Sequence, residues 1–146
     1  MREILFRGQT RRKGEKVRMD GSPVESNWVY GGVLCGSGDH SIIYQTEPDI
    51  AKKVVYTDTL GQYTGLTDKN GTKIFEGDIV RHYCKLPVPG GEIGTDRGTI
   101  KWDSEECFFF RTSLDGKDKT ISAKCEYEII GNIYDNPELI GGEQNG

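Results

Sequence analysis

Near its C-terminal end the chain reads Ile121-Ser122-Ala123-Lys124-Cys125-Glu126-Tyr127-Glu128-Ile129. Apolar and polar residues alternate without a break, so on an extended backbone all the apolar side chains would face one way. A period of two with a single apolar face is typical of a β-strand that is buried on one side. We therefore predict that the segment from Thr120 to Tyr134 forms one wall of a closed sheet.

Short apolar runs separated by turn residues give the rest of the chain the same character. The first strand is predicted at Ile4-Leu5-Phe6, and a polar connection follows over residues 8–27. The paired glycines Gly31-Gly32 interrupt the second strand and suggest a bulge there. The strands after the first are expected at residues 28–34, 42–44 and 54–56, from Asp78 to about Tyr83, and at residues 98–102 and 107–111.

Turn residues predict the connections between these strands. Asn70-Gly71 suits a type I′ hairpin turn, because both residues tolerate positive φ. Residues 86–97 open with two prolines and two glycines, which cannot hold a central strand, so a long loop is expected. Residues 103–106 would close a hairpin. Asn136 and Pro137 fit the N-cap and first position of one short C-terminal helical turn.

Composition indicates a small globular protein of many turns. The 146 residues include 20 glycines, and hydrophobic residues make up 34%. The net charge of −4 hides a gradient, since residues 1–31 have a balance of +3 and residues 103–146 a balance of −6. Nucleic-acid binders need positive potential to displace counterions, so the acidic total counts against that class without excluding a local patch.

The cysteines do not form a metal-binding pattern. Cys35, Cys84, Cys107 and Cys125 are 49, 23 and 18 residues apart, and the chain has two histidines. Structural zinc usually takes closely spaced pairs of ligands, so we expect no metal and no cofactor. The chain shows no signal-peptide stretch and no apolar run of membrane-spanning length. We predict a cytoplasmic protein of a bacterial host cell, with free thiols and no membrane contact.

Several segments together resemble a known family. They are Gly61-Gln62-Tyr63-Thr64-Gly65-Leu66-Thr67-Asp68-Lys69-Asn70-Gly71, Glu76-Gly77-Asp78-Ile79-Val80 and Ile129-Ile130-Gly131-Asn132-Ile133-Tyr134-Asp135-Asn136-Pro137-Glu138-Leu139, with Phe6-Arg7-Gly8 and Trp28-Val29-Tyr30-Gly31 before them. Their order and spacing are similar to those of YopX-like proteins of phages and prophages. The combination spans the chain from near its start to Leu139.

The resemblance implies a mainly β fold whose C-terminal part is similar to a small SH3-like β-barrel, and it implies no particular activity. We expect an N-terminal β-rich part at residues 1–60, packed on the barrel at residues 61–140, with a flexible tail at 141–146. The polar connection over residues 8–27 and the loop at 86–97 are longer than is common in the family, so any site near them departs from its pattern.

Two pairs of residues could carry chemistry. Glu76 and Asp78 share a strand face and could act as paired carboxylates in a metal-assisted hydrolase. We favour the alternative that Glu-Gly-Asp is a turn, in which Gly77 adopts unusual backbone angles and Asp78 accepts bonds from nearby amides. His82 and Cys84 also share a face, but no nucleophile context surrounds them. We therefore predict no catalytic residue and no enzyme activity.

A basic run could bind phosphate groups. Its six cations are Arg7, Arg11, Arg12, Lys13, Lys16 and Arg18, with Glu15 alone opposing them. The run contains no aromatic residues that could stack on bases, and a solvated connection between strands would need no partner. Nucleic-acid binding through Arg11, Arg12, Lys13 and Lys16 is the alternative function.

An aromatic strand suggests a protein interface. In Phe108-Phe109-Phe110 the outer two side chains face away from the middle one, so one face fills the core and the other needs a cover. Core packing alone explains the run equally well. With Trp102, Phe108 and Phe110 as candidates, the leading hypothesis is a non-catalytic module that binds a host or phage protein, as a monomer or a homo-oligomer.

Overall fold

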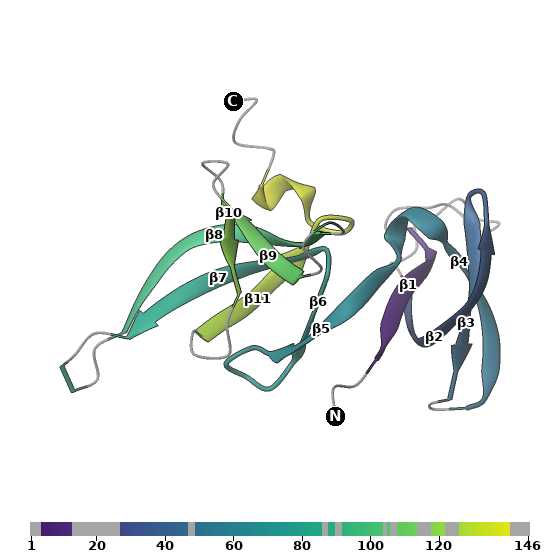
Figure 1. Ribbon diagram of the computed structural model, residues 1–146, viewed down its shortest axis with the longest axis horizontal. Helices are drawn as coiled ribbons and strands as arrows, with labels where there is room; N and C mark the ends of the chain where they lie inside the picture. The colour runs from purple at the N-terminus through teal and green to yellow at the C-terminus, as the bar shows by residue number, and fades with distance from the viewer. Residues whose placement is uncertain are drawn as a thin grey trace, which may run out of the picture. The chain divides into compact units, whose positions relative to one another are not determined.

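The computed structural model describes residues 4–12, 27–46, 49–85, 88–89, 92–103, 105, 108–113, 118–121 and 126–140. Within them the chain is mostly strand with almost no helix, which confirms the mainly β prediction (Figure 1). It divides into two compact units, Met1–Tyr63 and Thr64–Gly146, where the prediction set the boundary after residue 60. The predicted tail at 141–146 lies outside the described residues.

The first unit contains β1 (Phe6–Arg11), β2 (Asn27–Ser37), β3 (His40–Gln45), β4 (Ala51–Tyr56), the 3₁₀ turn η1 (Thr57–Thr59) and the start of β5 (Gly61–Thr67). The second unit contains the rest of β5, then β6 (Lys73–Phe75), β7 (Asp78–Lys85), β8 (Glu92–Asp103), β9 (Phe108–Ser113), β10 (Asp118–Thr120), β11 (Glu126–Asn132) and the 3₁₀ turn η2 (Pro137–Leu139). The two hydrogen-bonded orders are β4-β3-β2-β1-β5-β6 and β10-β9-β8-β7-β11.

The first unit has a small core. Val29, Ile43 and Val55 are buried together, and Leu60 packs against them. Gly8 lies opposite Val29 in the β1–β2 register, and a Cβ there would come within 2.8 Å of Val55. The strand β1 therefore approaches β4 closely because Gly8 has no side chain. The strand β1 continues to Arg11, so the polar connection that was predicted from residue 8 begins later than expected.

Gly31 lies where β2 changes partners. Its neighbour on β1 is Phe6, and from Gly32 onward β2 pairs with β3. A Cβ on Gly31 would meet the backbone oxygen of Tyr44 at 2.0 Å, so this position must be glycine. The bulge predicted at the glycine pair is wrong, because the register shift falls between Val33 and Cys35. Gly31 instead allows the backbone of β2 to approach the backbone of Tyr44 closely.

Gly31 and Gly32 provide a matched test of this packing. We expect Gly31→Ala to lower the free energy of unfolding by about 2–3 kcal/mol, because the new methyl group collides with backbone that cannot move aside cheaply. Gly32→Ala meets no atom within 4 Å and should leave stability unchanged or slightly raised. Urea unfolding of both variants measures the difference, and equal stabilities would contradict the proposed contact.

The second unit encloses a larger core. Its buried residues are Ile74, Val80, Ile100, Phe109 and Tyr127, and the partly buried residues packed against them are Leu66, Trp102, Ile121 and Ile129. Ile121 follows β10 and Ile129 belongs to β11, although these strands lie at opposite edges of the five-stranded sheet. Both edges therefore reach one core, so the sheet is curved around it.

The predicted single strand from Thr120 to Tyr134 is wrong. β10 ends at Thr120 and β11 begins at Glu126, and they pair with β9 and β7 respectively. Ser122 to Cys125 lie outside the described residues. The predicted apolar face holds for Tyr127, which is buried in the core, and for Ile129, which packs against it. Alternation reports which way side chains face but not which neighbour a strand pairs with.

Asp68 fixes the turn between β5 and β6 and joins it to β11. Its carboxylate is buried and accepts N–H bonds from Asn70 and Thr72 at 2.9 Å and from Ile129 at 3.1 Å. The N–H of Gly71 donates to the Asp68 carbonyl, and Gly71 has a φ of 86°. The turn therefore begins one residue earlier than the predicted Asn70-Gly71 turn, because the aspartate holds the backbone from inside.

We expect Asp68→Ala to cost about 3 kcal/mol of folding free energy, because three backbone N–H groups lose a charged acceptor. Asp103→Ala is the control, since the Asp103 carboxylate accepts an exposed N–H bond from Glu105. That change should cost well under 1 kcal/mol. Chemical denaturation of the two variants compares them, and similar losses would show that Asp68 does not join the turn to β11.

Three further predictions in this unit have clear outcomes. Gly77 has a φ of 93°, and Asp78 is buried and accepts the Phe75 N–H at 2.7 Å, which confirms the predicted turn. The predicted loop at 86–97 is wrong in its second half, because β8 begins at Glu92 and pairs with the end of β7 (Figure 1). The C-terminal helical turn is confirmed as η2, although the Asn136 side chain accepts from Asn132 rather than capping it.

Candidate protein-interaction surface

The three aromatic residues that were predicted to form an interface have different outcomes. Trp102 lies opposite Phe109 in the β8–β9 register, and their ring centroids are 4.6 Å apart. Trp102 is half-buried against the second core, and Phe109 belongs to that core. The side chains of Phe108 and Phe110 lie outside the described residues, so their role in an interface stays a prediction.

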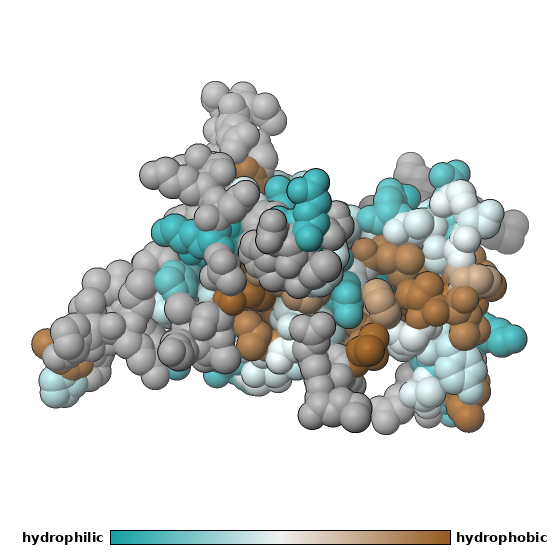
Figure 2. Space-filling model, viewed as in Figure 1, coloured by the Kyte–Doolittle hydropathy of each residue, from teal (hydrophilic) through white to brown (hydrophobic). Residues whose placement is uncertain are grey.

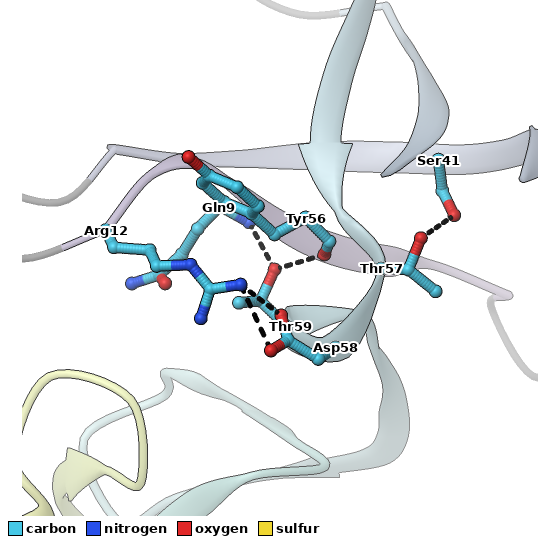
Figure 3. A network of polar contacts seen from close by, with 7 residues as sticks. All are labelled: Gln9, Arg12, Ser41, Tyr56, Thr57, Asp58 and Thr59. Atoms are coloured by element: carbon cyan, nitrogen blue, oxygen red, sulfur yellow. Dashed lines mark hydrogen bonds and ion pairs between the residues drawn. The ribbon is translucent and has the colours of Figure 1, made fainter. Parts of the chain in front are cut away.

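The basic run is held against aromatic rings contributed by other strands. Arg7 is only 6% exposed, and its guanidinium lies 4.5 Å from the centre of the Trp28 ring. Arg12 lies 4.1 Å from the centre of the Tyr56 ring and donates to both carboxylate oxygens of Asp58, at 2.9 and 3.1 Å (Figure 3). Arg11 is exposed. The candidates Lys13 and Lys16 lie outside the described residues.

A polar network positions Arg12 at the end of β4. The Thr59 hydroxyl accepts the backbone N–H of Gln9 at 2.9 Å and donates to the Tyr56 carbonyl at 2.7 Å (Figure 3). Ser41 and Thr57 share a further hydroxyl bond of 2.8 Å. These bonds bring the end of β1 beside η1, where Arg12 meets Asp58. Sequence reasoning missed the aromatic partners because the strand register, not the local sequence, supplies them.

The face of β2, β3 and β4 that points away from the first core is largely apolar. Cross-strand register aligns Gly32, Tyr44 and Lys52 in one row and Cys35, Ile42 and Val54 in the next. Ile43 and Val55 point into the core, so the residues that alternate with them, Ile42, Tyr44 and Val54, point outward. Val54 is 55% exposed, and no described side chain of the core covers it.

This face continues along β2. Tyr30 is 44% exposed, and Leu34, at the register shift, is 53% exposed. Figure 2 shows hydrophobic residues gathered over the strands of the first unit. We name Tyr30, Leu34, Ile42, Tyr44 and Val54 the β2–β4 patch. The sequence predicted these strands but gave no signal that Tyr30, Leu34 and Val54 would be exposed on them.

A sequence profile of the YopX protein matches residues 7–141. The chain belongs to the YopX family. The resemblance recognised in the sequence is thus confirmed. The crystal structure of protein EF1440 from Enterococcus faecalis is similar over 96% of this chain and 99% of that chain, with 22% sequence identity and a TM-score of 0.45. No curated protein matches the chain.

Of the residues of this YopX-family chain that were considered for catalysis, Asp78 has a structural role. Asp78 turns its carboxylate to the backbone of Phe75. The His82 ring lies 5.4 Å from that of Tyr127, and the Cys84 side chain lies outside the described residues. In the described part of the chain no three His, Cys, Asp or Glu residues gather as metal ligands, and no helix there has the length and apolar character to cross a bilayer.

A charged cluster surrounds Tyr83 in the second unit of the YopX-family chain. The Tyr83 hydroxyl donates to Glu128 Oε1 at 2.9 Å, and Lys69 Nζ lies 4.1 Å from the centre of the tyrosine ring. The bond to Glu128 raises the pKa of Tyr83, because a carboxylate stabilises the protonated phenol and repels the phenolate. The opposing effect of Lys69 and Arg81 is smaller.

We expect Glu128→Gln to lower the pKa of Tyr83 toward the ordinary tyrosine value. Because the folded protein holds this proton to higher pH than the unfolded chain, the bond stabilises the fold below about pH 10 and the contribution is lost as pH rises through the folded pKa. NMR titration of the Tyr83 ring carbon measures the shift. The exposed Glu138→Gln serves as control, and an unchanged Tyr83 titration in Glu128→Gln would contradict the assignment.

Proposed function

We propose that this YopX-family protein is a non-catalytic module that binds a protein of the bacterial host or of a phage through the β2–β4 patch. The observation that supports this is the joint exposure of Tyr30 and Leu34 on β2 and of Val54 on β4, two strands of one sheet with β3 between them. Apolar residues exposed together on a soluble domain are typical of interaction sites, because their burial in a complex releases ordered water.

The composition of the patch favours a protein partner over a nucleic acid. Three of its five residues, Leu34, Ile42 and Val54, are aliphatic and cannot stack on bases, whereas the rings of Tyr30 and Tyr44 could. Among the described cations of the basic run, Arg12 is neutralised by Asp58 and Arg7 is buried beside Trp28. Nucleic-acid binding would therefore depend on Arg11 with Lys13 and Lys16, and it is the less supported function.

The second unit supports the proposal as a scaffold, and we propose that it is a closed SH3-like barrel. Both edge strands of its sheet line one core, through Ile121 and Ile129. The turn after β5 binds β11 through the Asp68 carboxylate and through the N–H of Lys69, which donates to the Tyr127 carbonyl at 2.8 Å. Small barrels commonly present loops or a groove to partners.

Affinity capture from the bacterial cells that contain the protein tests the function. We expect the doubly substituted Leu34→Ser/Val54→Ser protein to bind the captured partner about tenfold or more weakly than the wild type, because two apolar contacts at an interface are each worth about 1 kcal/mol or more. Val88→Ser removes a similarly exposed valine from the second unit and should bind as the wild type does. Native mass of the complex distinguishes a different protein from a second copy of the chain.

Equal binding by the wild type and the Leu34→Ser/Val54→Ser protein would contradict the proposal, provided that both proteins unfold at the same denaturant concentration. Loss of binding in the Val88→Ser protein alone would place the interface in the second unit instead.

A further inference from the structure

The strand β4 lies at one end of its sheet, and β1 approaches it at Val55 without pairing with it. It is the last strand in the order β4-β3-β2-β1-β5-β6, so within the described residues one side of its backbone has no strand partner. Its pairing with β3 runs unbroken from Ala51 to Tyr56, without a register shift. The strand contains no proline. A straight edge of this kind can accept hydrogen bonds from an added strand.

In β4 the exposed residues come before the buried residue in the chain. Lys52, Lys53 and Val54 are exposed one after another, which means that both faces of the strand are accessible there. Val55 then enters the core and Tyr56 lies under Arg12. An added strand would therefore pair with β4 from Val54 back toward its start, and its outward side chains would lie beside the β2–β4 patch.

We propose that β4 takes up an extended acidic segment of the partner protein by antiparallel strand addition. This inference rests on the proposed function and names the chemistry of its partner. Carboxylates on the added strand would pair with Lys52 on the outer face and with Lys53 on the opposite face. Apolar residues beside them would pack on Val54 and Ile42, which lie opposite each other in the register.

The two lysines disfavour a second copy of this chain as the occupant. If β4 paired antiparallel with β4 of another copy, the lysines of the two strands would lie directly or diagonally opposite each other. Like charges in those positions repel, and lysines on edge strands commonly prevent pairing between copies. The same charges attract an acidic strand, so Lys52 and Lys53 select against self-association and for an acidic partner.

Short capped peptides test this inference on the full chain. The first contains two adjacent aspartates between valines, so that in antiparallel pairing the aspartates lie opposite Lys52 and Lys53. The second has lysine in place of aspartate, and the third is the acidic peptide with N-methylated valines, which cannot donate backbone hydrogen bonds. We expect the acidic peptide to shift the NMR amide signals of β4 and slow their hydrogen exchange. It should bind about tenfold more tightly than the lysine peptide, because two charge pairs form in one case and repel in the other. The N-methylated peptide should bind much more weakly.

The Lys52→Glu/Lys53→Glu protein should reverse the preference between the acidic and lysine peptides. Lys101→Glu, which changes an exposed lysine of β8, should leave it as it is in the wild type. Equal binding of the acidic and lysine peptides to the wild type, absence of binding by the acidic peptide, or equal binding of the N-methylated peptide would each overturn the inference.

The captured partner separates this inference from the proposed function. If Leu34→Ser/Val54→Ser loses the partner but Lys52→Glu/Lys53→Glu retains it with wild-type affinity, the patch binds a protein and strand addition is wrong. If Leu34→Ser/Val54→Ser retains the partner fully, the proposed function itself fails.

Discussion

The buried carboxylate of Asp68 joins parts of the second unit that are sixty-one residues apart in the chain. One oxygen accepts two N–H groups of its own turn, and the other accepts the N–H of Ile129 on β11. Tyr127 of β11 belongs to the core of the second unit, and Asp68 with the N–H of Lys69 holds β11 against the turn between β5 and β6. The Asp68 carboxylate is a buried acceptor for backbone groups, and it satisfies N–H groups that would otherwise lose their hydrogen bonds to water.

The first unit relies on the absence of side chains rather than on a buried charge. Gly8 lets β1 approach Val55, and Gly31 lets β2 lie against the backbone of Tyr44. Close approach of the strands makes a core of three buried aliphatic residues sufficient. Ile42, Tyr44 and Val54 alternate with the core residues Ile43 and Val55 and point outward. The β2–β4 patch therefore lies on the opposite face of the strands that build this core.

The sequence predicted what depends on neighbouring residues and missed what depends on distant ones. The Gly77–Asp78 turn, η2 and the β8–β9 hairpin follow from a few adjacent residues, and all were predicted. The single strand predicted from Thr120 to Tyr134 was wrong because β10 and β11 lie at opposite edges of the sheet and pair with different strands. The contacts of Arg12 with Tyr56 and Asp58 were missed for the same reason, since they join residues more than forty positions apart.

In the proposed function, the strand β4 of the first unit has to bind a partner and also has to avoid aggregation. Within the described residues, an unpaired edge next to the exposed Val54 and the half-buried Ile42 invites pairing with any extended chain, and such edges lead to aggregation unless they are protected. Lysine protects an edge without closing it, because it repels a like-charged strand and leaves the backbone donors and acceptors accessible. A proline or a bulge at β4 would have closed the edge to every partner. The presence of Lys52 and Lys53 in their place keeps the edge available to a strand of opposite charge, which is why selectivity and solubility can arise from the same two residues.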